Sequence, residues 1–321
     1  MNRFFKFFFL MFIPIIFISC TTIVKFEIEH PPLVDMRNME SITVLPLEWK
    51  DNGRYDYLAN DLTKVLISGV KKAKTYNFIE PAILRNTEKS DYWKYVDVYI
   101  DCKINNIDTH DKTEIKEEKE GEKTKTKKYV TRTATVIIEY KYITAIDEKV
   151  LGNFNKTAQA SETFEESARS SKWWAELLLN IFIPQGPSSE KLSKSAVQRF
   201  SSMMNNELNP YTTTEEREIA ESVNKEPIYK DAKKLVRQKK YIEALLLYKK
   251  IYEEAGSIVA GYNTALLLQA NNQFTDALAL LEELDDKLSR ISINSPPFIK
   301  KEMERLKIII NEIGILEEYK N

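Results

Sequence analysis

The sequences AKKLVRQKKYIEALLLYKKI (residues 232–251) and ALLLQANNQFTDALALLEEL (residues 265–284) match one another at an offset of 33 residues. Small, aliphatic and aromatic residues occupy equivalent places: Ala232 and Ala265, Leu235 and Leu268, Tyr241 and Phe274, Ala244 and Ala277, Tyr248 and Leu281. A period of this length is typical of helix pairs that stack and bury their apolar faces against their neighbours. The sequence therefore predicts an all-α repeat domain over residues 213–321, with repeats at about 227–258 and 259–291.

The two repeats resemble the tetratricopeptide repeat, in which paired antiparallel helices approach each other closely at small residues. In that family, the first helix of each pair lines a concave groove. The resemblance places the following residues in such a groove: Tyr229, Lys233, Val236, Arg237, Tyr262, Leu266 and Gln269. Their spacing puts them on one helical stripe, and tyrosines beside cations suit the binding of an extended or helical peptide from a protein partner. The alternative is a face that is solvated or covered by the same chain.

A last helix is predicted at residues 297–319, directly after Pro296. It lacks the alanines of the two repeats, so we interpret it as a capping helix. Helical repeats need neighbours to bury both of their faces, and about three units are the usual minimum. Two repeats and a cap are therefore expected to pack against the preceding domain or against a partner.

Residues 40–212 predict a separate α+β domain, in which apolar alternation indicates strands and helical spacing indicates helices. The order is a short strand in SITVLPLEW, a helix over residues 56–74, a short strand in YNFIEP, long strands in VDVYIDCKI and YVTRTATVIIEYKYITA, a strand within residues 147–164, and a closing helix before Pro210. This order favours a sheet-and-helix sandwich with helices on one face of a mixed or antiparallel sheet. Cys102 lies on the apolar side of its strand, so we predict a buried thiol.

These elements are similar to the fold shared by periplasmic lipoproteins of the CsgG and LpoB kind, over roughly residues 40–210. That family consists of secretion-channel subunits and activators of cell-wall synthases, and its members are not enzymes. The resemblance carries no functional residue over to this chain.

Two segments of this domain have an unusual composition. Residues 108–128 contain seven acidic and seven basic residues, which predicts a solvated hairpin loop or disordered arm, with a partner-docking arm as the alternative. Residues 172–184, KWWAELLLNIFIP, form an apolar stretch that is too short to span a bilayer. We interpret this stretch as a buried helix. A membrane-surface patch or partner contact is the alternative, because tryptophan favours interfaces.

The amino-terminal sequence has the layout of a signal peptide. Arg3 and Lys6 precede twelve apolar residues, 7–18, and Ser19 and Cys20 follow them. A membrane-spanning helix needs about 20 apolar residues, so an uncleaved anchor would be a short one. A secretory signal without lipidation is a further alternative.

The end of the apolar run, FISC, resembles the lipobox of bacterial lipoproteins. The resemblance implies that residues 1–19 are removed, that the Cys20 thiol receives a lipid, and that the new amino end is acylated, for instance with palmitate. Residues 20–39 would then be a tether. Thr21 and Thr22 stand where an acidic residue would retain the protein, which favours the periplasmic face of the outer membrane over the inner membrane. Each buried CH₂ contributes about 0.8 kcal/mol, so two or more acyl chains anchor a protein well.

Composition limits the other classes of function. The chain has 47 basic and 48 acidic residues, and removal of Arg3 and Lys6 with the signal peptide leaves 45 against 48, a charge of −3. This balance gives no electrostatic reason to expect a nucleic-acid partner. Two histidines, His30 and His110, and two cysteines offer no zinc ligand set. Glycine-rich phosphate loops and nucleophile elbows are also missing from the sequence, so we expect no cofactor, no metal and no catalytic residue.

The sequence thus favours a non-catalytic, lipid-anchored scaffold or adaptor in the bacterial cell envelope. It would contact the membrane through Cys20 and a protein partner through its helical repeats. The alternative is a subunit of an envelope export or assembly channel, which requires a homo-oligomer.

Overall fold

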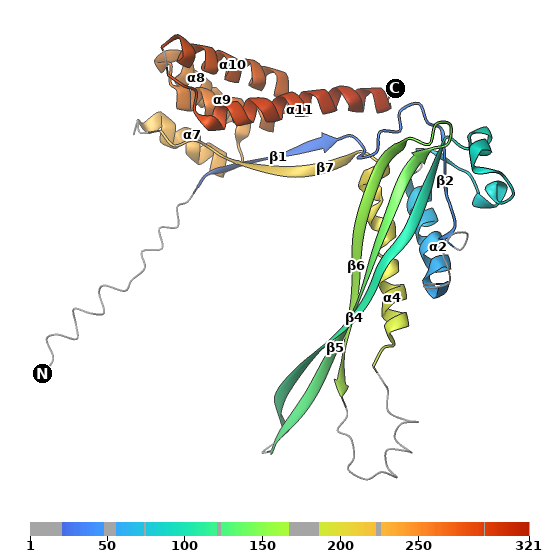
Figure 1. Cartoon of the computed structure of the whole chain (residues 1–321). Helices are drawn as coiled ribbons and strands as arrows, with labels where there is room; N and C mark the ends of the chain where they lie inside the picture. The colour runs from blue at the N-terminus through green and yellow to red at the C-terminus, as the bar shows by residue number, and fades with distance from the viewer. Residues whose placement is uncertain are drawn as a thin grey trace, which may run out of the picture. The chain divides into compact units, whose positions relative to one another are not determined.

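The computed structural model describes residues 21–47, 56–73, 75–120, 123–166, 186–222, 226–291 and 293–320. The chain forms two compact units, whose elements are labelled in Figure 1. The helical unit combines Met1–His30 with Thr212–Asn321, and the sheet unit is Pro31–Tyr211. Strands and helices occur in both units, so the chain belongs to the α+β class, as the sequence predicts.

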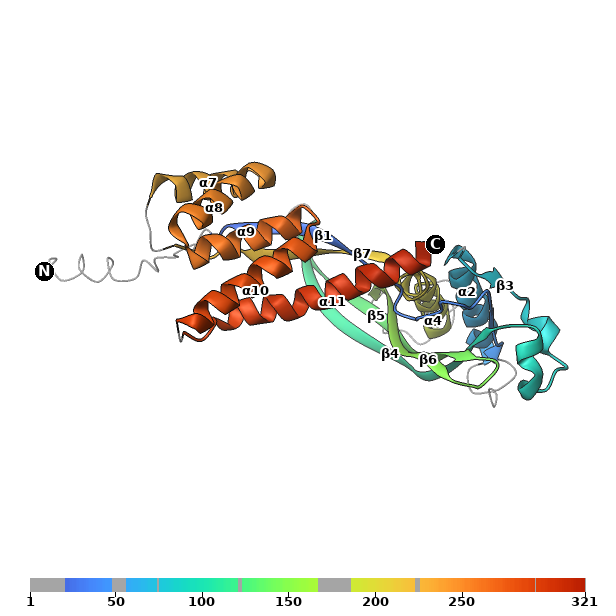
Figure 2. The same cartoon turned by 90° about the horizontal axis from the view of Figure 1, so that it is seen from above.

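The helical unit contains helices that pack against one another in chain order (Figure 2). They are α7 (Pro227–Arg237), α8 (Tyr241–Ala255), α9 (Ile258–Ala270), α10 (Phe274–Arg290) and α11 (Pro297–Lys320). Gly256 ends α8 with a φ of 62°, and Ser257 then caps α9 by accepting a hydrogen bond from the Ala260 amide (3.3 Å). These end signals separate the two helix pairs at the predicted place.

The two helix pairs share one turn geometry. Lys239 and Asn272, 33 residues apart, both have positive φ angles of 59° and 61°. In each turn the amide of the following residue donates to an earlier carbonyl, that of Leu235 (3.0 Å) or Leu268 (2.9 Å). The four alanines of the sequence repeat are fully buried, namely Ala232, Ala244, Ala265 and Ala277. The sequence repeat is therefore also a repeat in backbone structure.

The predicted tether over residues 20–39 is corrected by the structure. Ile23–His30 forms strand β1, which pairs with β7 (Tyr211–Glu218). The contacts of Thr22 with Ile219 (3.0 Å) and of Lys25 with Glu216 show that the two strands run antiparallel. Apolar residues alternate along β1 and pack on the helices, so the segment gains a buried face that a spacer would lack.

The sheet unit contains a mixed five-stranded sheet in the order β3–β2–β4–β5–β6. Its strands are β2 (Ser41–Val44), β3 (Asn77–Phe78), β4 (Val98–Glu120), β5 (Lys123–Thr144) and β6 (Val150–Glu166). β2 is parallel to β3 and β4, whereas β4, β5 and β6 are antiparallel.

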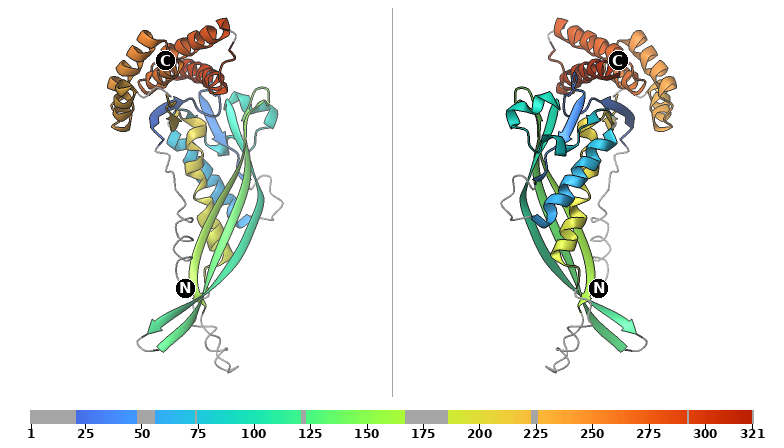
Figure 3. Two further views of the ribbon diagram at one scale, coloured as in Figure 1. Left: turned by 90° about the vertical axis from the view of Figure 1, so that its left-hand side faces the viewer. Right: turned by 90° about the vertical axis from the view of Figure 1, so that its right-hand side faces the viewer.

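Helices cover one face of this sheet. α2 (Asp56–Ala73) and α4 (Ser189–Val197) lie side by side against it (Figure 3), followed by α5 (Phe200–Met203) and α6 (Asn205–Leu208). Sheet residues of one parity meet these helices in the core, among them Ile100, Cys102, Val136, Ile138 and Tyr140. The thiol of Cys102 is thus buried, as predicted. A smaller core lies at the 3₁₀-helical turns Pro81–Leu84 and Lys89–Lys94.

The charged segment 108–128 is not the loop or disordered arm that the sequence predicts. It belongs to the β4–β5 hairpin, whose pairing continues from Asn106 with Ile137 to Glu120 with Lys123. Glutamate and lysine have low strand propensity, but the register set by the apolar part of these strands extends into the charged part. The side chains from Asp111 to Glu117 are exposed, so the solvated part of the prediction is confirmed.

Candidate functional site

The residues predicted to line a groove lie on α7 and α9, and most are buried. The buried ones are Tyr229, Val236, Tyr262, Leu266 and Gln269. The two cations contact the strand segments of the same unit. Lys233 forms an ion pair with Glu221, and Arg237 Nε donates to Thr22 Oγ1 (2.9 Å).

The two-stranded ribbon β1–β7 covers this face of the helices. Val24, Phe26 and Ile28 are buried in the core of the helical unit, and β1 packs against α7, α9 and α11. The ring of Phe26 lies under the guanidinium group of Arg305, 5.5 Å from its centre. Lys25, Glu27 and Glu29, which have the opposite parity in β1, are exposed. One side of the ribbon thus completes the core of the helix array.

Polar side chains hold both ends of the ribbon. Asn263 is fully buried in α9. Its Oδ1 accepts from the Ala220 amide (2.7 Å) and its Nδ2 donates to the Ala220 carbonyl (3.0 Å), as a neighbouring strand would. At the other end, His30 bonds Glu312 through Nδ1 (2.9 Å) and Thr213 through Nε2 (2.8 Å). The register of the ribbon on the helices is therefore fixed at two places.

A partly buried ionic network joins the middle of β7 to α9 and α11. The Arg305 guanidinium reaches Glu215 (2.5 Å), pairs with Glu302, and donates to Gln269 Oε1. Arg217 pairs with Glu215 (2.6 Å) and Glu302 (3.4 Å). Loss of the arginines would leave the buried carboxylate of Glu302 without a partner, which is destabilising. Sequence analysis missed this network. Its one local signal was Gln269 inside the otherwise apolar helix α9.

The inner face of the array is consequently covered by the same chain, which is one of the alternatives that the sequence leaves open. A partner reaches the predicted groove residues only if the ribbon leaves the helices. The hydrogen bonds of Asn263 and His30 and the ionic network oppose that movement.

An open groove of about 720 Å³ lies between α8 and α10. Thr264 and Leu268 of α9 line it, and they point about half a turn away from the inner-face residue Leu266. The walls carry leucines, namely Leu245, Leu246 and Leu280. Charged residues surround them: Lys249 and Glu253 on α8, and Asp276, Glu283 and Lys287 on α10.

The rim of this groove includes a polar cluster. Lys287 Nζ donates to the Tyr252 hydroxyl (2.7 Å) and pairs with Glu283 (2.6 Å). The hydrogen bond from Lys287 holds the pKa of Glu283 below its ordinary value. Glu283 is therefore ionised at neutral pH, and the groove combines an apolar surface with fixed charges at its edge.

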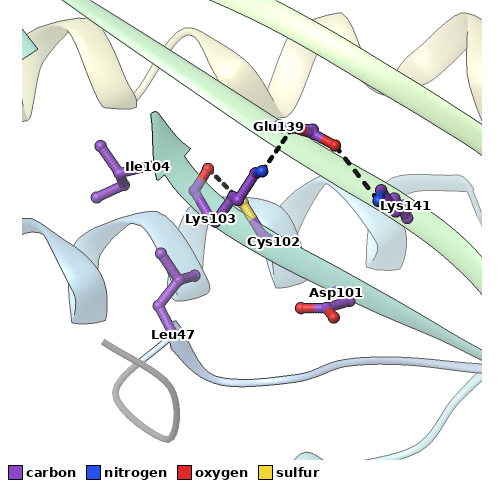
Figure 4. A pocket seen from close by; sticks show the side chains of 7 residues that line it. All are labelled: Leu47, Asp101, Cys102, Lys103, Ile104, Glu139 and Lys141. Carbon is purple, nitrogen blue, oxygen red and sulfur yellow. Dashed lines mark hydrogen bonds and ion pairs between the residues drawn. The ribbon is translucent and has the colours of Figure 1, made fainter. Parts of the chain in front are cut away.

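A smaller pocket of about 260 Å³ lies on the sheet unit beside Leu47 (Figure 4). Lys103 and Lys141 both pair with Glu139, at 2.9 and 3.5 Å. With Asp101, the lining has two acidic and two basic residues and no net charge. Because the cations are neutralised within the pocket, its lining favours no charged ligand.

The closing segment of the sheet unit contains a buried carboxylate. Glu207 of α6 is fully buried, accepts hydrogen bonds from the hydroxyls of Tyr140 (2.7 Å) and Tyr142 (3.0 Å), and pairs with Lys156 (2.8 Å). Burial, together with the negative charge of Glu207, raises the pKa of Tyr140 and Tyr142 well above the ordinary value of tyrosine. These contacts fasten α6 to β5 and β6 and are structural.

Two sequence predictions, Cys20 and the segment 172–184, lie outside the described residues. Within the part of the chain that the structure describes, no helix has the length and apolar character needed to cross a membrane. Over the same residues, no three histidine, cysteine or acidic side chains are grouped so that they would hold a metal ion.

Comparisons with known proteins give one distant likeness to report. No family model matches the sequence, and no curated protein matches it. Among solved structures, the chain is similar to lipoprotein GNA1162 from Neisseria meningitidis, at 10% identity over 44% of this chain and 94% of that chain, with a TM-score of 0.23. A likeness at this TM-score carries no argument about this chain.

Proposed function

We propose that this protein is a non-catalytic, lipid-anchored adaptor of the bacterial cell envelope that binds a protein partner through its helix pairs. The basic start, short apolar run and lipobox-like FISC support attachment through Cys20. Thr21 and Thr22 support delivery to the periplasmic face of the outer membrane. The turn repeated at Lys239 and Asn272 and the buried alanines support helix pairs of the tetratricopeptide type.

The observation that carries the adaptor function is the open groove between α8 and α10. Leu246 is 62% exposed beside it, and Leu245, Leu268 and Leu280 line it. Because the walls of the groove are helices, an amphipathic helix could pack between α8 and α10 and place leucine-like residues, repeated at helical spacing, against these leucines. The charged rim would pair with the polar face of that helix. We therefore propose an amphipathic helix of a partner protein as the occupant.

Site-specific photocrosslinking in cells tests this proposal. A crosslinker at Leu246 should give one product of defined mass, whereas a crosslinker at Ile308, which is 60% exposed on α11, should not. A synthetic helix that spans the captured segment should bind the purified protein and should fail to bind a Leu280→Asp variant. The groove is not the partner site if the crosslinker at Leu246 gives no product, or if the synthetic helix binds the Leu280→Asp variant as tightly as the parent.

A separate experiment tests the anchor. Cys20→Ala in the full chain should accumulate uncleaved precursor and should abolish incorporation of labelled fatty acid. If the variant is processed and lipid-labelled like the parent, Cys20 is not the lipidation site, and the groove proposal is unaffected.

The sheet unit favours a second candidate function, a channel or assembly subunit that self-associates. Within the described residues, β6 pairs with β5 on one side, so this 17-residue strand leaves its other edge open. Open edges of this length are templates for pairing with another chain. Native mass after detergent extraction distinguishes the two functions, since a ring supports the channel and a monomer supports the adaptor.

A further inference from the structure

Basic residues concentrate on α7 and on its turn to α8. This basic cluster consists of Lys230, Lys233, Lys234, Arg237, Lys239 and Lys240. The same eleven residues, 230–240, contain one acidic residue, Asp231, so the segment carries six positive charges and one negative charge, a net +5 in a chain whose total is −1. Such a local excess marks a surface that attracts anions.

Most of the cluster is free to meet a partner. Lys230, Lys234, Lys239 and Lys240 are exposed. Among the residues that the structure describes, Lys234, Lys239 and Lys240 form no ion pair, whereas Lys233 pairs with Glu221. The exposed lysines are therefore not neutralised within the fold.

The cluster lies where the chain enters the helical unit. Thr22 is 2% exposed, and its hydroxyl accepts a hydrogen bond from Arg237 (2.9 Å). The Lys25 amide donates a hydrogen bond to the hydroxyl of Tyr241, the first residue of α8 (3.1 Å). The start of β1 therefore lies beside the end of α7 (Figure 1). Cys20 precedes Thr22 by two residues, which span at most about 7 Å. A lipid on Cys20 would thus hold the basic cluster close to the bilayer.

The conformation of Lys239 adds an independent observation. Lysine is strained at positive φ, and the equivalent place in the second helix pair is Asn272 with nearly the same φ. Asparagine tolerates this conformation better than lysine does. The first turn therefore has a lysine at a position where asparagine, the residue of the second turn, would adopt the same backbone conformation with less strain.

We propose that the basic cluster is a second membrane contact, which binds the anionic headgroups of phospholipids and orients the helical unit on the bilayer. Ile242, 63% exposed in the first turn of α8, would reach the boundary between headgroups and acyl chains. The orientation rests on the lipid anchor of the proposed function, but headgroup binding by the cluster does not need the lipid. An acyl chain and a group of basic residues together bind an anionic membrane more tightly than either does alone, because their binding free energies add.

Vesicle flotation of residues 21–321, which contain all the buried residues described for both cores, tests the proposal without the lipid. The fragment should bind vesicles of equal phosphatidylcholine and phosphatidylglycerol, and it should not bind phosphatidylcholine alone. The double variant Lys239→Asn with Lys240→Asn should bind about 30-fold more weakly, since each lysine near an anionic surface contributes about 1 kcal/mol. The control, Lys300→Asn with Lys301→Asn, removes the same charge from exposed positions in α11 and should bind like the parent.

The Lys239→Asn change copies the second turn, so the double variant should melt at or above the temperature of the parent, which excludes unfolding as the cause of weaker binding. Inorganic phosphate at equal ionic strength should compete no better than chloride. Equal binding by parent and double variant, binding to neutral vesicles, or tighter binding to a DNA duplex than to the anionic vesicles would overturn the proposal. None of these results bears on lipidation of Cys20, which the Cys20→Ala experiment tests separately.

Discussion

Replacement of Phe26 by alanine tests whether β1 is an integral part of the helical unit. Phe26 is 5% exposed, and its ring packs under the Arg305 guanidinium. An aromatic side chain buries at least about 150 Å², which corresponds to about 4 kcal/mol at 25 cal/mol per Å². Alanine retains part of that area but leaves a cavity, so measured costs of such changes are about 3–5 kcal/mol. We expect Phe26→Ala to lower the free energy of unfolding of the helical unit by about 3 kcal/mol.

The distribution of chromophores separates this effect from the sheet unit. All four tryptophans of the sequence fall within Pro31–Tyr211, so the helical unit contains none, and the described one, Trp93, belongs to the sheet unit. Far-UV circular dichroism at the helix minimum is dominated by α7 to α11. In urea denaturation of residues 21–321, Phe26→Ala should move the circular dichroism midpoint to lower urea and leave the fluorescence midpoint in place. The melting temperature of the helical unit should fall by more than about 10 °C.

A matched control decides how the result is read. Ile308→Ala removes an apolar side chain that is 60% exposed on α11, and it should cost less than about 1 kcal/mol. If Phe26→Ala costs no more than Ile308→Ala, β1 does not occupy the inner face, and the helices must be stabilised in another way. That outcome would restore the tether predicted for residues 20–39.

Four further predictions concern other sites. Gly261→Ala should destabilise the helical unit by about 1–3 kcal/mol, because its new Cβ would lie 2.8 Å from a leucine carbon of α10. Gly314→Ala, which meets nothing within 4 Å, should instead stabilise it by up to about 1 kcal/mol in the same melting experiment. Glu207→Gln removes the buried partner of Lys156 and should cost the sheet unit about 3 kcal/mol by tryptophan fluorescence, and an unchanged midpoint would contradict this. Burial opposes ionisation of Asp97, but three hydrogen bonds outweigh it and lower its pKa below 3.8. Its contribution to stability is present above pH 4 and is lost as pH falls through the lowered pKa, a loss that Asp97→Asn should lack in acid titrations.

The helix pairs were predictable from sequence because their signals are local and repeated. The repeats expected at about 227–258 and 259–291 correspond to α7–α8 and α9–α10, and the expected cap at 297–319 corresponds to α11. The alanines and the turn at an offset of 33 specify this arrangement without any distant contact. Propensity and periodicity act over a few residues, so such elements are the most reliable ones to predict.

The ribbon was missed although half of its signal is present in the sequence. Val24, Phe26 and Ile28 alternate with charged residues, as a half-buried strand requires. The other strand, β7, has the sequence YTTTEERE and no apolar face. Its inward residues Glu215 and Arg217 are partly buried, and Glu302 and Arg305 of α11 supply the charges that pair with them. A long-range ionic network of this kind leaves no local pattern, and the same holds for the groove that the ribbon fills.

The short repeat array and the β1–β7 ribbon each bury an apolar face of the other. α9 is apolar on nearly every side, so two helix pairs and a cap leave its inner face without cover. Longer arrays bury such faces against additional repeats, whereas here β1 and β7, which flank the sheet unit in sequence, supply the missing surface. An anchor at Cys20 would therefore act directly on a strand of the core. Force on the anchor would first load the contacts of Thr22 with Arg237 and of Phe26 with Arg305, so the helical unit would be held at its basic cluster.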